Sequence, residues 1–314
     1  MPHPGAHSPA APPDLAEGLV VSTSGRHCSV QAPDGALRLC HPRGKKLEAV
    51  VGDRVIWRAT EDEGVIERVS PRRNQLYRQD ETRIKSFAAN LDQVLIVLAA
   101  EPAFSERFLV RALIACEAAG IRALIALNKA DLAQPFAGAW HQLAPYRTMG
   151  YATFALALKP HVSDPGGTDF VALERTLQGA ATLILGPSGV GKSTLVNRLV
   201  PTAAATTGAL SRGLKTGTQT TTRTHWYWLG DDKAGALIDS PGFQEFGLYH
   251  VAASGLAALM PDFRPYLGQC RFYNCTHTHE PGCAVMAAVD GATGTASIGP
   301  SRYRIYADLY AELS

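Results

Sequence analysis

The stretch LGPSGVGKST at Leu185–Thr194 limits the possible folds of this chain more than any other part of the sequence. It matches the pattern G-x-x-x-x-G-K-[ST], follows the apolar run ATLIL and leads into the helical pattern STLVNRLV, a context that disfavours a chance glycine-rich turn. Such a loop binds nucleoside triphosphates because its backbone N–H groups converge on phosphate oxygens, its lysine neutralises the terminal phosphates and its hydroxyl ligates Mg²⁺. The expected phosphate-binding residues are Gly186, Pro187, Ser188, Gly189, Val190, Gly191, Lys192, Ser193 and Thr194, with Ser193 as the magnesium ligand.

The motif NKAD at Asn128–Asp131 follows the apolar run RALIAL and predicts which base the nucleotide carries. Its aspartate accepts hydrogen bonds from two guanine N–H groups that adenine lacks, so adenine would leave a buried carboxylate unpaired. Four such residues also occur in surface turns, but in a chain with a phosphate loop they favour GTP and disfavour an ATPase or a kinase. The expected guanine-binding residues are Asn128, Lys129, Ala130 and Asp131.

The segment ALIDSPGF, residues 236–243, supplies a D-x-x-G motif. Asp239 is expected to hold Mg²⁺ through water, and the Gly242 amide is expected to meet the γ-phosphate. The alternative is an ordinary Ser-Pro-Gly turn after a strand. A polar stretch before this segment ends in three threonines, residues 220–222, and one of them is expected to complete the magnesium coordination when GTP is bound. Thr221 is our candidate.

The sequence leaves several candidates for the residue that orients the attacking water. Many GTPases carry a glutamine directly after the D-x-x-G glycine, whereas this chain has Phe243 there. Hydrolysis is therefore expected to be slow without help from another residue or a partner. The candidates are Gln219, Gln244 and His225, of which we select Gln219, although each also suits an ordinary switch or strand side chain.

The order of these motifs is reversed relative to ordinary GTPases, because the guanine motif precedes the phosphate loop and the D-x-x-G motif. One spatial site then requires a circularly permuted GTPase domain, in which the chain ends lie elsewhere. The segment after Gly242 consequently leads straight into the C-terminal part of the chain, where a nucleotide-dependent shift is expected to reposition a whole domain.

Alternating strand and helix patterns surround the motifs. The runs QVLIVLAA, RALIAL, YATFALAL and ATLILG predict strands, and residues 105–120, 140–148 and 169–179 show helical patterns. Ser105 is expected to cap the first of these helices and Gly120 to end it. This alternation predicts an α/β fold with a parallel sheet covered by helices on both faces. Residues 70–90 are expected to be a linker.

Residues from Gly18 to about Ser70 show short alternating apolar runs separated by Gly, Pro and Asp. This pattern predicts a five-stranded barrel of OB-fold size. Small barrels of this type often bind RNA, and basic side chains here would suit phosphate contacts, although a merely solvated face would look the same. The basic residues are Arg38, Arg43, Lys45, Lys46, Arg54 and Arg58.

Three of the six cysteines cluster near the C-terminus with histidines. Their compact spacing predicts a closed tetrahedral Zn²⁺ site, which is structural because four protein ligands leave no position for water. The predicted ligands are Cys270, Cys275, His277 and Cys283. His279 competes with His277 but better suits the surface. Three nearby arginines suit either RNA contact or solvated helix charges, namely Arg271, Arg302 and Arg304.

The composition, with 46% apolar residues, 18% charged residues and a net charge of +2, is typical of a globular protein. The longest apolar run, VLIVLAA, is far shorter than the roughly 20 residues of a membrane helix. The first residues, MPHPGAHSPAAPPD, lack a signal-peptide pattern and predict a disordered tail. We therefore expect a cytoplasmic protein without membrane contact, in which Cys28, Cys40 and Cys116 are ordinary, partly buried thiols.

Together these motifs resemble the RsgA family of small-ribosomal-subunit biogenesis GTPases over nearly the whole chain. The resemblance implies an OB-fold, a permuted GTPase domain and an α-helical zinc-binding domain that together bind the 30S subunit and its 16S rRNA. It also implies late-stage maturation near the decoding region and GTP hydrolysis that the subunit stimulates. Our domain boundaries are a tail at 1–16, the OB-fold at 17–72, the GTPase domain at 73–248 and the zinc-binding domain at 249–314, and we expect a monomer.

One departure from the family concerns catalysis. Some members carry a histidine just before the threonine triplet, proposed to position the attacking water, whereas this chain has Gln219. Glutamine can orient water but is not a comparable proton acceptor. A second hypothesis therefore stays open, in which the chain is an rRNA-binding assembly placeholder whose GTP occupancy, not turnover, controls docking.

Overall fold

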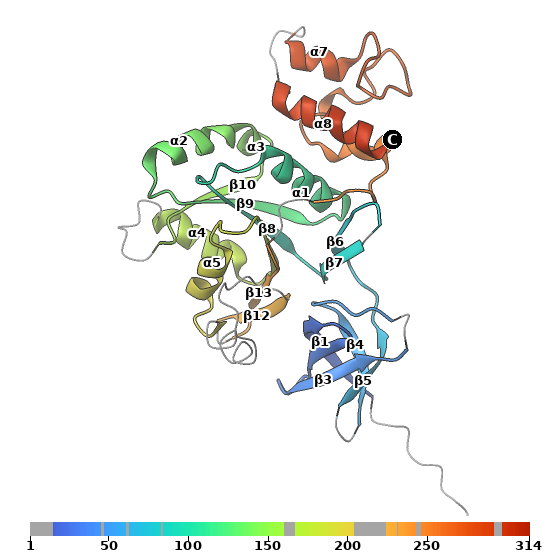
Figure 1. Ribbon diagram of the computed structural model, residues 1–314, viewed down its shortest axis with the longest axis vertical. Coiled ribbons are helices and arrows are strands. Elements are labelled where there is room, and N and C mark those ends of the chain that lie inside the picture. Colours follow the sequence, from blue (N-terminus) through green and yellow to red (C-terminus); the bar gives the residue numbers. More distant parts are fainter. Residues whose placement is uncertain are drawn as a thin grey trace, which may run out of the picture. The chain divides into compact units, whose positions relative to one another are not determined.

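The computed structural model describes residues 15–44, 47–60, 63–82, 84–159, 167–203, 224–230, 232–242, 246–291 and 297–314. The chain divides into two compact units, residues 1–72 and 73–314, whose elements are labelled in Figure 1. Most of the predicted N-terminal tail lies outside the described residues. Its last two residues, Leu15 and Ala16, already belong to the first strand.

The first unit is a closed five-stranded barrel. Its strands are β1 (Leu15–Ser24), β2 (His27–Gln31), β3 (Leu37–Pro42), β4 (Arg54–Ala59) and β5 (Gly64–Val69). They pair in the order β1-β2-β3-β5-β4, and β4 returns to β1; only the β3–β5 pair is parallel. This closure confirms the predicted OB-like barrel. The inward-facing residues form its core, namely Val20, Cys28, Val30, Cys40, Val55, Trp57 and Ile66.

The basic residues of the barrel do not form a uniformly unpaired patch. Arg43 and Arg58 both pair with Glu67, at 2.6 and 3.1 Å. These two arginine contacts hold the pKa of the Glu67 carboxyl below its usual value. Arg38 and Arg54 are exposed, whereas Lys45 and Lys46 lie outside the described residues.

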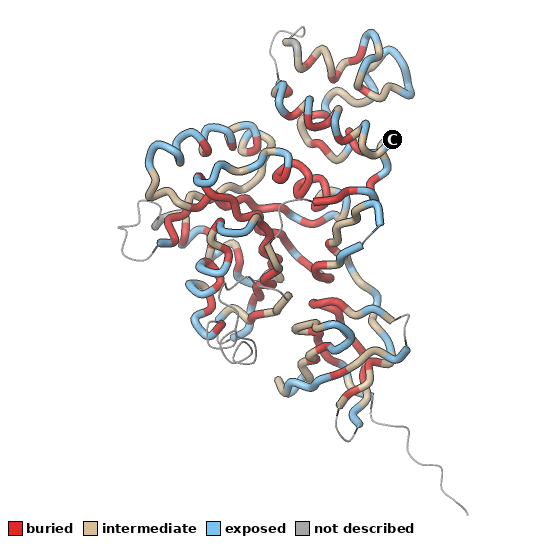
Figure 2. The backbone as a smooth tube through the Cα atoms, viewed as in Figure 1, coloured by how far each residue is buried: buried red, intermediate tan, exposed pale blue. Residues whose placement is uncertain are grey.

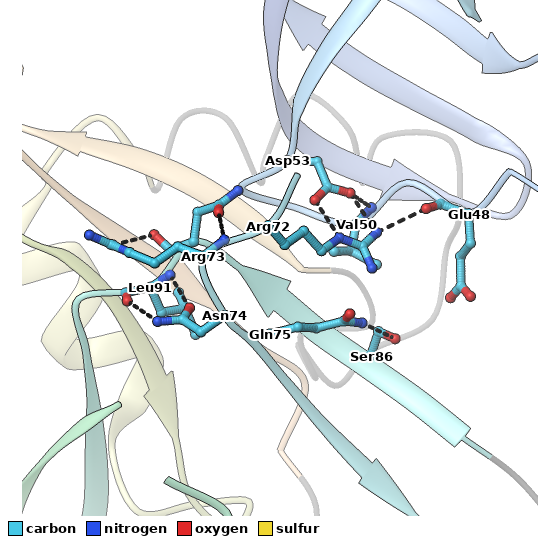
Figure 3. Close-up of polar contacts among 10 residues, drawn as sticks. Glu48, Val50, Asp53, Arg72, Arg73, Asn74, Gln75, Ser86 and Leu91 are labelled. Atoms are coloured by element: carbon cyan, nitrogen blue, oxygen red, sulfur yellow. Dashed lines mark hydrogen bonds and ion pairs between the residues drawn. The ribbon is translucent and has the colours of Figure 1, made fainter. Parts of the chain in front are cut away.

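Two consecutive arginines mark the end of one unit and the start of the next (Figure 3). Arg72 makes two hydrogen bonds to the buried carboxylate of Asp53, at 2.7 and 2.8 Å, and thereby belongs to the barrel. Arg73 is held by the backbone and side chain of Asn90 and by Asp92, at 2.7 to 3.0 Å. Each arginine therefore anchors the chain within its own unit.

The predicted linker at residues 70–90 is instead largely a β-hairpin. Strands β6 (Gln75–Gln79) and β7 (Ile84–Ala89) pair in antiparallel register. Leu76 and Phe87 are buried, and the burial of these apolar side chains stabilises two short strands whose polar residues concealed them in the sequence.

The nucleotide-motif region forms a six-stranded sheet in the order β10-β9-β8-β11-β13-β12. Its strands are β8 (Gln93–Ala99), β9 (Arg122–Asn128), β10 (Ala152–Leu156), β11 (Ala181–Leu185), β12 (His225–Leu229) and β13 (Gly235–Asp239). All neighbours are parallel except β12, which runs antiparallel to β13. The central strands are buried, as Figure 2 shows, which is typical of a sheet covered on both faces.

Helices cover this sheet on both sides, with α1 (Glu106–Ala118), α2 (Ala133–Gln142) and α3 (Ala144–Thr148) on one face and α4 (Gly167–Leu177) and α5 (Lys192–Leu199) on the other (Figure 1). Ser105 caps α1 as predicted, since its hydroxyl accepts a hydrogen bond from the Phe108 amide at 3.2 Å. The helix predicted around 140–148 is two helices and begins earlier, at Ala133.

The C-terminal region is helical and irregular, as predicted. It contains the 3₁₀ helices η1 (Ala253–Leu259) and η2 (Arg264–Tyr266) and the α-helices α7 (Ala284–Asp290) and α8 (Pro300–Leu313). Arg302 of α8 is only 3% exposed and forms two hydrogen bonds with Asp262, at 2.6 and 2.7 Å. This arginine is therefore a buried structural residue, which excludes the RNA contact considered for it from the sequence.

Candidate nucleotide site and metal centre

The phosphate loop connects β11 to α5. Gly191 caps α5 with a φ of 105°, a left-handed conformation that favours glycine. The Lys192 ammonium is buried and donates to the carbonyl oxygens of Gly186 and Pro187, at 2.9 and 2.7 Å. Burial lowers the pKa of Lys192, and the nearby Asp239 carboxylate opposes that shift. The lysine therefore lies folded over its own loop, with a carboxylate close by.

Asn128 joins the guanine motif to the phosphate loop. Its side-chain N–H group donates to the Val190 carbonyl at 2.9 Å. A methyl group on Gly191 would lie 2.4 Å from the same Asn128 nitrogen, so the two motifs approach too closely for any larger residue there. The structure thus brings together two motifs that the sequence separates and presents in reversed order.

The loop after β10 is a part of the site that the sequence reasoning missed. The Leu158 amide donates to Asn128 Oδ1 at 3.2 Å, so Asn128 is held from both sides. The Ala157 carbonyl in turn accepts a hydrogen bond from Arg198 at 3.3 Å, and the Arg198 guanidinium lies 3.9 Å from the centre of the Phe170 ring. Only the position of this loop, directly after a parallel strand adjacent to the strand with NKAD, could have indicated it.

The D-x-x-G segment lies at the end of β13, next to the phosphate loop. Asp239 and Ser240 are buried, and the Ser240 hydroxyl donates to the Ile184 carbonyl of β11 at 2.8 Å. A methyl group on Gly242 would lie 2.8 Å from Ser188 Oγ and 2.9 Å from Lys192 Nζ. Gly242 therefore lies so close to the phosphate loop that the Ser188 and Lys192 side chains would have to move to admit a larger residue.

Some of the remaining predicted site residues lie in the part of the chain that the structure describes, and others lie outside it. Lys129 has a left-handed backbone, its ammonium donates to the Glu101 carbonyl, and the half-buried Asp131 follows it in the same turn. Ser193 and Thr194 lie in the first turn of α5, directly after Lys192, and are exposed. His225 lies in β12 opposite Asp239 in the antiparallel ladder. Gln219, Thr221, Phe243 and Gln244 lie outside the described residues.

Three thiols and one imidazole converge in the C-terminal region. The ligand atoms of Cys270, Cys275, His277 and Cys283 all lie within 4.8 Å of one another. His277 Nδ1 is 3.5 Å from Cys270 Sγ and 3.4 Å from Cys283 Sγ, and the two sulfurs are 3.9 Å apart. Bonds of about 2.3 Å to sulfur and 2.0 Å to nitrogen place tetrahedral ligands about 3.5 to 3.8 Å apart, so these three separations suit one zinc ion.

Neighbouring groups hold this cluster in place. The amides of Ala284 and Met286 point at the sulfurs of Cys270 and Cys283, at 3.4 and 3.5 Å. Two tyrosines of α8 bind the loop that carries the metal ligands, since Tyr303 donates to the His277 carbonyl at 3.0 Å and Tyr306 to the Thr276 carbonyl at 2.7 Å. His279 is exposed and outside the cluster. The loop at residues 270–283, here called the metal loop, and helix α8 therefore form one structural unit, the metal-binding module.

Comparison with known proteins identifies the family to which this chain belongs. The family model described as RsgA GTPase matches residues 69–249, which is more than half of the chain. The chain belongs to the RsgA GTPase family. This result confirms the resemblance drawn from the motifs, and it identifies the chain as a GTPase whose substrate is GTP.

Full-length relatives in the RsgA family are close in sequence. A protein of Variovorax paradoxus named small ribosomal subunit biogenesis GTPase RsgA is 58% identical, and the match covers 96% of this chain and 93% of that protein. A protein of Burkholderia pseudomallei with the same name is 50% identical, with the same coverage of both chains.

Solved structures confirm the permuted arrangement seen in this RsgA family member. The crystal structure of YloQ, described as a circularly permuted GTPase, is 25% identical and superposes with a TM-score of 0.68 over 96% of this chain and 95% of its own. The structure of YjeQ from Thermotoga maritima is 27% identical, with a TM-score of 0.71 over 95% and 98% of the two chains. In the part of the chain that the structure describes, no helix has the length and apolar character of a membrane span.

Proposed function

We propose that this GTPase acts in late maturation of the small (30S) ribosomal subunit and that the subunit stimulates its hydrolysis of GTP to GDP and phosphate. The observation that carries the nucleotide part is the 2.9 Å hydrogen bond between Asn128 and the Val190 carbonyl, which joins the base-recognition and phosphate-binding motifs. The small-subunit part is supported by the printed name that the relatives share.

The nucleotide would bind with its base at Asp131 and its phosphates at Lys192. The Ser193 hydroxyl and the Asp239 carboxylate offer the hard oxygen donors that Mg²⁺ prefers, and Asp239 is close enough to Lys192 to affect its pKa. Bound Mg²⁺ would neutralise charge on the phosphates. When GTP arrives, its phosphates would compete with the Gly186 and Pro187 carbonyls for the Lys192 ammonium.

We further propose that the Cys270, Cys275, His277 and Cys283 cluster holds a structural zinc ion. The support is its donor set of three thiolates and one imidazole together with the spacing of the ligand atoms. Zinc would join η2, α7 and the loop that α8 binds, and would stabilise a region with little regular secondary structure of its own.

We propose that the C-terminal region of this chain contacts the 16S rRNA of the subunit. Between two of the metal ligands, Tyr273 is completely exposed, at 102% of its reference area, and Phe272 is 41% exposed. The guanidinium of Arg271 lies 5.5 Å from the centre of the Phe272 ring. Exposed aromatic rings beside a cation suit stacking on unpaired bases and attraction to phosphates. We also propose that the protein is a cytoplasmic monomer that does not contact membranes.

The test is a measurement of GTP hydrolysis against the concentration of purified 30S subunits, with 50S subunits as control. We expect the rate to rise and saturate with 30S only. If GTP-dependent docking occurs without any rise in rate, the placeholder alternative replaces the catalytic one. Base recognition is tested separately with Asp131→Asn, which should weaken GTP binding and favour xanthosine triphosphate, since an amide can donate to the xanthine 2-oxo group.

A further inference from the structure

A buried arginine outside the nucleotide site contacts two segments that are far apart in the sequence. Arg111 lies in the middle of α1 and is only 8% exposed. Its guanidinium donates to the Phe246 carbonyl at 3.0 Å and forms an ion pair with Glu312 of α8. A buried guanidinium is retained in a folded protein when its donors are satisfied, and here the two partners belong to different functional regions.

Phe246 begins the described chain after the D-x-x-G motif, and its segment is firmly packed. The Phe246 and Leu248 side chains are fully buried. The Gln79 amide donates to the Gly247 carbonyl at 3.1 Å, and the Tyr249 amide donates to the Gln79 carbonyl at 3.1 Å. A methyl group on Gly247 would lie 2.2 Å from Asp80 Oδ1, so this segment lies directly against β6.

Glu312 occupies the opposite side of the arginine. It also accepts a hydrogen bond from Arg107 at 3.3 Å, one turn earlier on α1. Burial acts to raise the pKa of the Glu312 carboxyl, but the contacts with Arg111 and Arg107 outweigh it and lower the pKa. Glu312 is therefore ionised at neutral pH. It lies on the same helix as Tyr303 and Tyr306, which bind the metal loop.

We infer that Arg111 is a positioning residue that transmits the nucleotide state of the D-x-x-G segment to the metal-binding module, through the Phe246 carbonyl on one side and the Glu312 carboxylate on the other. The inference rests on the proposed function in one respect, since it takes GTP to bind at Gly242. A shift of residues 246–249 would alter the position of the Arg111 guanidinium and hence of α8. By linkage, a partner that binds one position of α8 preferentially would change the affinity for the nucleotide by the same factor by which the nucleotide changes the affinity for that partner.

The first experiment needs no ribosomal subunit. Amide hydrogen exchange is measured in residues 246–249 and in α8, with GDP and with a non-hydrolysable GTP analogue bound. We expect wild type to show a nucleotide-dependent difference in α8, and Glu312→Gln and Arg111→Gln to lose it. The matched control is Asp308→Asn, on the same helix, because Asp308 is exposed and contacts Arg107 at 3.7 Å. If α8 in wild type ignores the nucleotide, or if Glu312→Gln keeps the difference, the inference is wrong.

The second experiment measures GTP hydrolysis with and without 30S subunits. We expect Glu312→Gln to keep intrinsic turnover and the KM for GTP within about twofold while its stimulation falls about tenfold. The double variant with Arg111→Gln should lose no more than the single variants, since both act on one contact. Equal losses of intrinsic and stimulated rates would indicate a merely structural pair and would overturn the inference. If 30S fails to stimulate even wild type, the proposed function fails, and hydrogen exchange still decides the role of Arg111.

Discussion

The side-chain amide of Asn128 and the carbonyl of Val190 are 62 residues apart in the sequence and 2.9 Å apart in the structure. The same side chain accepts a hydrogen bond from the Leu158 amide. Asn128 therefore fixes the base-recognition turn, the phosphate loop and the loop after β10 relative to one another, whatever the order of these segments along the chain.

Replacing Asn128 separates its two contacts. Asn128→Asp keeps the acceptor for Leu158 but places a carboxylate oxygen against the Val190 carbonyl, whereas Asn128→Ala loses both bonds. Because a buried polar group left unpaired costs about 1–3 kcal/mol, we expect either change to weaken GDP and GTP binding by about 10- to 100-fold. Titration with a fluorescent guanine nucleotide measures this. The control is Asn74→Ala, which removes contacts to Leu91 and should leave nucleotide affinity unchanged; equal affinities in all variants would contradict the prediction.

Two glycines of the phosphate loop differ in the space around them. Both have positive φ, 105° for Gly191 and 81° for Gly189, but only a methyl group on Gly191 would clash, with Asn128, while the space around Gly189 is open. We expect Gly189→Ala to lower the free energy of unfolding by about 1–2 kcal/mol, the cost of a left-handed alanine, and Gly191→Ala to lower it clearly more. Denaturant unfolding without nucleotide compares the two, and equal losses would show that the clash is relieved at no cost.

Removal of the metal should expose a specific set of thiols. Burial raises the pKa of the Cys28 and Cys40 thiols to about 11, so both stay protonated and unreactive at pH 8 in the folded barrel. We expect a chelator to release zinc and to make only Cys270, Cys275 and Cys283 reactive toward a thiol reagent. His277→Ala should mimic chelation and His279→Ala should not, and metal analysis with thiol titration checks both. Reaction of Cys28 or Cys40 in the folded, metal-free protein would contradict this assignment.

The exposed aromatic ring of Tyr273, in the metal-binding module, should affect docking to the subunit without affecting folding. Tyr273→Ala removes a ring that is fully exposed, so we expect thermal unfolding to be unchanged. We expect the free energy of binding to 30S subunits to become weaker by about 1–3 kcal/mol, the contribution of one stacked base. Ile84→Ala removes another exposed apolar side chain, 65% exposed in β7, and serves as control. Cosedimentation with 30S subunits measures the affinity, and equal binding by both variants would exclude stacking by Tyr273.

The sequence predicted those parts of the site whose chemistry is local. The phosphate loop, NKAD and the cysteine cluster each depend on residues at short, fixed spacings, and the long apolar strands β8 and β9 produce clear patterns. The hairpin β6–β7 was missed because its strands are short and half polar, so that tertiary packing of Leu76 and Phe87 stabilises them.

Contacts between distant residues left no such pattern. Arg302 has the sequence context of a surface charge on a helix, and only its pairing with Asp262 shows that it is buried. Arg111 and Glu312 are 201 residues apart, and nothing near either one indicates the other. A single sequence contains periodicity and spacing but not the partner of a buried charge, and this is why the coupling contacts emerged only from the structure.

The two hydrogen bonds that join Gln79 to Gly247 and Tyr249 have a mechanical consequence. The chain that comes from the barrel passes Arg73 and continues into β6, and the chain that goes to the metal-binding module departs just after Tyr249. Both covalent connections of the nucleotide domain therefore lead to one short ladder. A displacement of residues 247–249 therefore strains the bonds of Gln79, so permutation has brought the two attachment points of this domain next to each other instead of leaving them independent.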